Sequence, residues 1–474
     1  MKTIRLIFIL VISALLIHPA IGQDSVQITG FPGQVLELNT YNTYGAIQWQ
    51  DSLPGGQWSN IDGLTRQRAN ITVSDTERFV RARFTEGACN PMFSAITKIT
   101  PLAGYGNDTA SIPLRPVAHK IIWNDASTAK KLTQDNFGDY GRVRRLGNSD
   151  TLLLVYHGGP NTLDWLNIYM RISYDNGETW QDEKMIANHR EYPDKYWRYC
   201  TPELLVMRNG WVMLAYEANA RPDENKSEIH IKISKDSCRT WDGPIKYLTG
   251  RTWEPAMVQL HDGEIELFYS SENLWWDKRN ESGSNVYQDI KVLRSTNNGL
   301  SWSLESRAAY YPLKRDGMPV PLVLQNNKGV VFAIETVNAG TSPYILWRPM
   351  NEPWTVTTSN FENNTYRWLA TGFSGHGGAP YLLQLPTGET VLSAHIYRGG
   401  DWHQNNYMEV MVGDDEARNF GDVTRPWGTL PNNSGAVNNS LFLKNDTTIV
   451  TITCRMFPDG TGGLYWLEGS IVEK

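Results

Sequence analysis

Three short segments decide the fold of this 474-residue chain: SYDNGETW (173–180), SKDSCRTW (234–241) and STNNGLSW (295–302). They align without gaps, and their first residues lie 61 positions apart both times. Asp175 can cap the backbone N–H groups of a tight turn, and Gly177 can adopt a positive φ. A turn that recurs at a constant period indicates stacked supersecondary units.

A second repeated element precedes each turn motif, and its pattern predicts strand, tight turn, strand. Its clear copies are TPELLVMRNGWVMLAYE (201–217), EPAMVQLHDGEIELFYS (254–270), VPLVLQNNKGVVFAIE (320–335) and APYLLQLPTGETVLSAH (379–395). Weaker copies occupy residues 141–157 and 437–453. Six copies over residues 119–474 correspond to about 59 residues per unit, and we see no convincing long helix. The sequence therefore predicts an all-β fold, with a six-bladed β-propeller over residues 119–474.

Residues 23–100 precede the repeats and resemble an immunoglobulin-like β-sandwich. The segment AIQWQ places Trp49 in an early strand, and VSDTERFVRARF (73–84) predicts a corner followed by a strand. Phe79 replaces the usual corner tyrosine, and Cys89 has no partner cysteine inside the domain. We expect a spacer or stabilising module, followed by a linker over 101–118 that is rich in Pro and Gly.

Residues 1–22 are predicted to be an export signal. Lys2 and Arg5 precede an apolar run at 6–17, and residues 20–22 form a small-x-small cleavage site. The run is shorter than the roughly 20 residues that a membrane-spanning helix needs, and no later stretch is apolar enough to span a bilayer. We therefore expect an exported protein, periplasmic or secreted, without membrane insertion.

The composition narrows the range of functions. Acidic residues (50) outnumber Lys and Arg (44), which argues against a nucleic-acid partner. Cys89, Cys200, Cys238 and Cys454 show neither CxxC nor zinc spacing, and the sequence does not choose among their three possible pairings. There is no P-loop and no dinucleotide fingerprint, so we expect no metal and no cofactor. The 18 Trp and 22 Tyr suit a flat ligand. The expected partner is an oligo- or polysaccharide, bound by a monomer.

Two glutamates occupy what the sequence indicates are matching places in neighbouring repeats: Glu203 in RYCTPELL and Glu254 in RTWEPAMV. Each lies beside a proline and is followed by a mostly apolar strand. The inner strands of a propeller surround a central channel, so both carboxylates are expected at its mouth. Glycosidic cleavage needs two such groups, one as nucleophile or base and one as acid. The alternative is that both are ion-paired structural residues. The flanking Trp197 and Arg198 favour a substrate site, and Arg198 is a candidate to hold the ionised carboxylate.

The turn motif resembles the Asp-box, S-x-D-x-G-x-T-W, of sialidase-like propellers. The second copy has Cys238 at the glycine position, and the third has Asn297 at the aspartate position. In such propellers the turn lies on the outer rim, so the resemblance implies no catalytic role for it. Trp180, at the end of the first copy, is expected to pack between blades.

Four segments resemble the exo-arabinanase family of glycoside hydrolases, family ninety-three. They are WEPAMVQLHDGEIELFYSSEN (253–273), QDIKVLRSTNNGLSW (288–302), RDGMPVPLVL (315–324) and GAPYLLQLPTGETVLS (378–393). The resemblance covers roughly residues 140–455. It implies cleavage of linear 1,5-α-L-arabinan from the chain end, with release of arabinobiose and retention of configuration. It also implies that Glu203 is the nucleophile and Glu254 the general acid/base.

Other polar residues near the predicted strand starts are candidates for substrate binding, each with a structural alternative. They are Arg142, Asp289, Arg315, Asp316 and His376. Asp316 can bind sugar hydroxyls or pair with Arg315, and Asp289 can orient Glu254. Trp165, Trp275 and Trp276 lie in predicted loops, where they can stack on sugars or pack between blades.

Two other functions use the same scaffold. A sialidase needs three arginines around a carboxylate and a tyrosine nucleophile backed by a glutamate. Arg142, Arg198, Arg348 and Arg398 are present, but we find no Arg-Ile-Pro motif of the kind those enzymes usually show. A non-catalytic glycan-binding propeller would keep the aromatic residues and lose one of the two glutamates. The presence of both glutamates in this sequence favours an enzyme.

Overall fold

The computed structural model describes residues 26–30, 35–40, 45–87, 89–101, 114–134, 137–159, 166–192, 194–273, 288–310, 315–337, 343–350, 352–354, 366–398 and 405–474. The predicted export signal and the three loop tryptophans (165, 275 and 276) lie outside these residues. Regular structure is almost entirely β. The short 3-10 helices are Ala126–Thr128, His189–Glu191, Glu224–Lys226 and Gln325–Asn327. No helix within the described part of the chain is long and apolar enough to cross a membrane.

The N-terminal part consists of two β-sheets that share one core. The larger sheet contains, in spatial order, β1 (Val26–Gly30), β8 (Thr97–Pro101), β6 (Arg78–Thr85), β3 (Ala46–Ser52) and β4 (Ser59–Asn60), with β7 (Met92–Phe93) also paired to β6. The smaller sheet pairs β2 (Val35–Asn39) with β5 (Arg68–Thr72). Trp49, Val80 and Phe84 of the larger sheet pack with Leu38 and Ile71 of the smaller one. Two sheets therefore face each other here, while the immunoglobulin-like topology stays a prediction.

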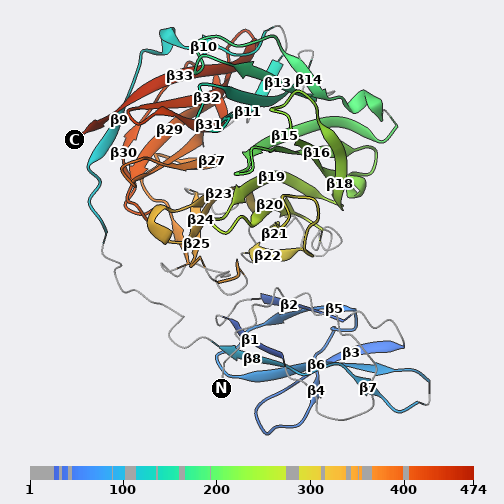
Figure 1. Ribbon diagram of the computed structural model, residues 1–474. Helices are drawn as coiled ribbons and strands as arrows, with labels where there is room; N and C mark the ends of the chain where they lie inside the picture. The colour runs from blue at the N-terminus through green and yellow to red at the C-terminus, as the bar shows by residue number, and fades with distance from the viewer. Residues whose placement is uncertain are drawn as a thin grey trace.

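Six further sheets follow one another along the chain (Figure 1). The first contains β11 (Phe137–Arg145), β12 (Leu152–Gly159), β13 (Asn167–Ser173) and β14 (Lys184–Ala187). The second contains β15 (Tyr196–Val206), β16 (Val212–Ala220), β17 (Glu228–Ser234) and β18 (Asp242–Thr249). The third contains β19 (Thr252–Gln259), β20 (Ile265–Ser271), β21 (Asp289–Ser295) and β22 (Ser306–Ala309). The fourth contains β23 (Arg315–Val323), β24 (Val330–Val337), β25 (Tyr344–Arg348) and β26 (Arg367–Leu369). The fifth contains β27 (His376–Gln384), β28 (Thr390–Tyr397), β29 (Asn406–Gly413) and β30 (Gly421–Thr424).

The sixth sheet joins the two ends of this region. It contains β31 (Gly435–Asn445), β32 (Thr448–Met456) and β33 (Gly462–Glu473), and β33 also pairs with β9 (His119–Trp123) and β10 (Lys130–Lys131). The first strands of successive sheets contact one another in order from β11 to β31, and β31 contacts β11 again. The six sheets therefore surround a common centre, as Figure 1 shows. The second strands β12, β16 and β20 are buried along their whole length because neighbouring sheets cover both faces.

Each of the six innermost strands carries a β-bulge with a non-glycine residue at positive φ. These residues are Tyr140 (58°), Thr201 (47°), Glu254 (56°), Met318 (52°), Ala379 (42°) and Asn438 (49°). A left-handed backbone at such a residue costs about 1–2 kcal/mol, so the surrounding structure must hold it there. Bulges re-aim side chains and are over-represented beside functional sites.

The strand register corrects the prediction that Glu203 and Glu254 occupy matching places. Glu254 itself lies at the bulge of β19, and its counterpart in β15 is Thr201. Glu203 corresponds to Ala256, two residues further along the strand, or about 6–7 Å. The adjacent prolines suggested a match, but the proline precedes Glu203 and follows Glu254.

The three turn motifs form one local hydrogen-bonded structure. In the first motif Thr179 N–H and Oγ1–H both donate to the Asp175 carboxylate, at 2.8 and 2.5 Å. In the third motif Asn297 Oδ1 accepts from the N–H of Ser301 at 2.9 Å, so an amide replaces the carboxylate. Cys238 takes the glycine position of the second motif at a φ of 66°. As expected, Trp180 contacts a neighbouring sheet, where it meets Trp466 edge-on. All four cysteines are free.

Candidate active site

Glu254 is a half-buried carboxyl group that two donors hold in place. Its Oε2 accepts hydrogen bonds from Ser270 Oγ at 2.7 Å and from the Met318 N–H at 2.9 Å. Burial, together with the negative charge of Glu335, raises the pKa of Glu254 to about 7, although both hydrogen bonds act in the opposite direction. A carboxyl group with this pKa retains its proton near neutral pH, as a general acid requires.

Glu335 of β24 is a second carboxylate beside Glu254. A Cβ placed on Gly317 would lie 3.6 Å from Glu254 Oε2 and 3.7 Å from Glu335 Cγ, so both side chains lie beside the same glycine. Glu335 Oε2 accepts the N–H of Ala379 at 2.9 Å. Burial raises the pKa of Glu335, while that N–H and the charges of Arg315 and His376 lower it. Burial outweighs these groups, so the pKa of Glu335 lies above its ordinary value.

The sequence did not lead us to predict Glu335 as a site residue, because the candidate carboxylates came only from the starts of the repeats. A signal was available, since Glu335, Ser270 and Glu217 are the last residues of three aligned repeats. These residues lie opposite the bulges, where Gly317 pairs with Glu335, Trp253 with Ser270 and Cys200 with Glu217.

Glu217 also acts on Glu254, from the second sheet. Its Oε2 accepts the hydroxyl of Thr201 at 3.0 Å, and its own pKa is raised by burial and lowered by the charge of Arg198. Arg198 donates through Nε to Asn219 at 2.6 Å. The expectation that Arg198 holds the ionised Glu203 is therefore wrong, because its charge acts on a different carboxylate.

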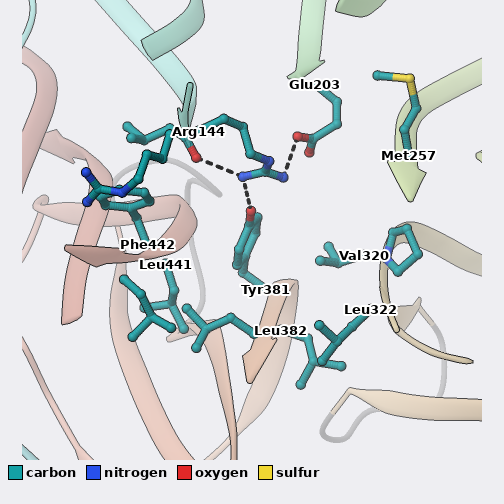
Figure 2. Close-up of a pocket in the computed structure, with 14 residues that line it drawn as sticks. Arg144, Glu203, Met257, Val320, Leu322, Tyr381, Leu382, Leu441 and Phe442 are labelled. Atoms are coloured by element: carbon teal, nitrogen blue, oxygen red, sulfur yellow. Dashed lines mark hydrogen bonds and ion pairs between the residues drawn. The ribbon is translucent and has the colours of Figure 1, made fainter. Parts of the chain in front are cut away.

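Glu203 forms a buried ion-pair cluster. Arg144 Nη2 donates to Glu203 Oε1 at 2.7 Å, and Arg142 Nε donates to Oε2 at 3.3 Å. Figure 2 shows Arg144 between Glu203 and the hydroxyl of Tyr381, at the edge of a cavity of about 300 Å³ with mostly apolar walls. Glu254 and Glu335 do not line this cavity. The geometry of Glu203 matches the ion-paired structural alternative.

Truncation of Glu203 is expected to destabilise the fold. Glu203→Ala leaves two largely buried guanidinium groups without their carboxylate, which costs about 3–5 kcal/mol in free energy of unfolding. Chemical denaturation followed by tryptophan fluorescence measures this cost. The matched control is Asp150→Ala, because that side chain is 75% exposed and its loss should change stability by less than about 0.5 kcal/mol. Equal stabilities of the two variants would contradict the structural role.

Two candidate substrate ligands turn out to be internal ion pairs. Asp316 is fully buried and accepts two bonds from Arg367, both at 2.8 Å, so it neither pairs with Arg315 nor has an oxygen to offer a sugar. Asp289 is fully buried against Arg307 at 2.8 Å, and no contact joins it to Glu254 within the described residues. Both predictions failed because the arginine partners come from outer strands, 18 positions along the chain for Asp289 and 51 positions for Asp316.

Arg315 and His376 lie where they act electrostatically on Glu335. Arg315 also donates to Glu272 and Gln288, each at 2.7 Å. The ring of Trp197 lies under the guanidinium groups of Arg198 and Arg221, at 4.1 and 3.5 Å from its centroid.

Arg142 lies over the ring of Tyr140 at 3.8 Å. Of the predicted site residues, the structure therefore gathers Glu254, Arg315 and His376 around Glu335, and Arg142 with Glu203.

Among the described residues, no group of three or more His, Cys, Asp or Glu side chains could hold a metal ion.

The comparisons with known proteins concern two parts of the chain. Residues 21–102 match a family model described as a domain of unknown function (DUF8696). No curated protein matches the chain.

Solved structures are similar in fold to the larger part. A protein of unknown function from Dyadobacter fermentans covers 77% of this chain and 100% of its own, at 16% identity and a TM-score of 0.53. The α-L-arabinanase of Penicillium chrysogenum, complexed with arabinobiose, covers 75% and 98% at 17% identity and a TM-score of 0.50. An intramolecular trans-sialidase from Ruminococcus gnavus covers 72% and 95% at 10% identity and a TM-score of 0.48. At these identities the likeness to the first two structures shows a shared fold and nothing more.

Proposed function

We propose that residues 119–474 form a six-bladed β-propeller glycoside hydrolase, with Glu254 as its general acid/base. The observation that carries this proposal is the pair of carboxyl groups beside Gly317. One of them, Glu254, has a pKa of about 7, and the other, Glu335, lies near two basic side chains. Glycosidic cleavage requires two carboxyl groups, one that gives a proton and one that is ionised, and the two basic side chains beside Glu335 assign the ionised role to Glu335.

The second catalytic carboxylate is Glu335 in this proposal, in place of Glu203. Both oxygens of Glu203 are engaged by arginines, and the residue lies deeper along its strand. Glu335 is partly accessible and is the charge with the largest effect on Glu254. The assignment of Glu203 as nucleophile remains the competing hypothesis, and variants separate the two.

The chemistry follows from the two protonation states. Glu335 forms a bond to the anomeric carbon while the glycosidic C–O bond breaks, and the leaving oxygen takes the proton of Glu254. The resulting Glu254 carboxylate then accepts a proton from water. That water attacks the anomeric carbon, the ester bond to Glu335 breaks, and the sugar is released with retained configuration.

We further propose that the enzyme is exported, bears the immunoglobulin-like module at its N-terminus, and removes units from the end of an arabinan-like polysaccharide. Support comes from the sequence motifs and from the fold shared with an arabinanase that was crystallised with arabinobiose. Product analysis tests the proposal directly. Linear arabinan and a sialylated oligosaccharide are incubated separately with the protein, and the products are identified by chromatography. Release of arabinobiose from arabinan is expected.

The sialidase alternative meets a specific obstacle. Tyr140 is the tyrosine beside Glu254 and Glu203, and burial raises its pKa well above the ordinary value. A buried phenol of this kind is a weak nucleophile at neutral pH. Release of sialic acid would nevertheless establish the alternative. Binding of arabinan with no product at all would favour the non-catalytic glycan-binding propeller.

Gly317 is expected to be essential for activity. Alanine at this position places a methyl group against both Glu254 and Glu335 and 2.6 Å from Gln288 Nε2, which must then move. A displacement of about 1 Å at a reacting group lowers turnover about 10²-fold. Gly421→Ala is the matched control, because its added Cβ meets nothing within 4 Å. Equal kcat values for the two folded variants would argue against a reaction between these carboxyl groups.

A further inference from the structure

Ser270 forms a compact hydrogen-bonded triangle with Glu254. Its Oγ donates to Glu254 Oε2 at 2.7 Å and accepts from the Met318 N–H at 3.1 Å. The same N–H also reaches Glu254 Oε2 at 2.9 Å. Ser270 is fully buried, and its strand β20 pairs directly with the strand that carries Glu254. Two donors therefore converge on one oxygen of this carboxyl group.

A protonated carboxyl group has one O–H oxygen and one carbonyl oxygen. A hydrogen on Oε2 would point at the N–H of Met318 and the O–H of Ser270, so that oxygen serves as the acceptor. The proton then belongs on Oε1. We infer that Ser270 is a positioning residue that fixes the acid proton of Glu254 on Oε1, the oxygen to which no described residue donates a hydrogen bond. This inference rests on the proposed function for its catalytic meaning.

The neighbouring second sheet contains a similar hydrogen bond between a hydroxyl and a carboxylate, but the two groups have exchanged positions. Thr201 occupies the bulge position of Glu254 and donates its hydroxyl to Glu217, which occupies the position of Ser270. A hydroxyl therefore meets a carboxylate at this point of both sheets. Among the six bulge residues of the innermost strands, Glu254 is the only carboxylic acid. The serine opposite it is thus placed to orient an acid that points toward the centre.

Removal of the Ser270 hydroxyl has a predictable sign. The charged and titratable groups that interact electrostatically with Glu254 include Glu335 from β24, Glu217 from β16, Tyr140 from β11 and Cys200 from β15, and Ser270→Ala leaves all of them in place. The hydroxyl stabilises the ionised carboxylate, so its loss favours the protonated form. Glu254 then stays protonated to a higher pH, while its proton is held less firmly toward the substrate.

The experiment compares Ser270→Ala with Cys454→Ala. Cys454 is fully buried at the corresponding position of the sixth sheet, so both variants remove one heavy atom from the same kind of site. For Ser270→Ala we expect the alkaline limb of the kcat/KM profile to move up by about 1 pH unit, with kcat lowered about 10-fold. Cys454→Ala should leave the limb unchanged.

A second readout does not depend on activity. The infrared difference spectrum between the wild-type protein and Glu254→Gln reports the stretching band of the protonated Glu254 carboxyl group. The pH midpoint at which this band disappears should be higher when Ser270→Ala is present in both proteins. An unchanged titration midpoint would overturn the inference, even if kcat falls. Absence of turnover on every glycan would refute the proposed function alone, because the infrared titration still tests Ser270.

Discussion

Glu254→Gln is expected to lower kcat/KM on a natural glycoside by about 10²–10⁴-fold, the usual contribution of general acid–base catalysis. Glutamine keeps the size of the side chain and an oxygen that accepts from Ser270 and Met318. It has no acidic proton to give to the leaving oxygen. Initial rates on arabinan and on an aryl arabinoside measure the loss. The rate of glycosyl-enzyme formation should fall less for the aryl substrate, because its leaving group needs little protonation.

The pH profile provides a second signature of the same residue. The acid form of Glu254 is the active one, so wild-type activity should fall as the pH rises through about 7. This alkaline limb should be absent from the residual activity of Glu254→Gln. A variant with wild-type rates and an unchanged profile would remove Glu254 from the mechanism.

Glu335→Gln is expected to produce the largest loss of all, about 10⁴–10⁶-fold in kcat, as for removal of a nucleophile. The amide cannot form the glycosyl ester, and Glu335 is the carboxylate that lies with Glu254 beside Gly317. Loss of its negative charge should also lower the pKa of Glu254, since that charge helps to raise it. On the alkaline side of the pH profile, any residual activity of this variant should therefore fall at a lower pH than the activity of the wild-type enzyme.

Glu203→Gln is the matched control that separates the two assignments. If Glu203 has a structural role, the folded variant should keep most of its turnover while its melting temperature falls, because Arg142 and Arg144 lose a charged partner. The opposite result, an inactive Glu203→Gln with an active Glu335→Gln, would restore Glu203 as the nucleophile. Circular dichroism of each variant ensures that rates are compared per folded molecule.

Local chemistry made a large part of this protein predictable from its sequence. The turn motif is stabilised by bonds within four residues, such as those from Thr179 to Asp175, so it leaves a recurring pattern in the sequence. The strand–turn–strand repeats are also local, and their number equals the number of sheets after residue 119. Glu254 could be identified because it begins one of those repeats.

Tertiary structure decided which residues of other sheets meet Glu254, and it decided the roles of the other charged residues. Glu335 lies 81 positions along the chain, and Arg367 lies 51 positions from the Asp316 that it neutralises. A bulge shifts the register of every innermost strand, so proximity to a proline did not indicate which residues are equivalent. Side chains from different sheets meet only when β9 pairs with β33 and the sheets surround one centre. Contacts of that kind depend on how whole sheets pack, and no short-range pattern in the sequence records them.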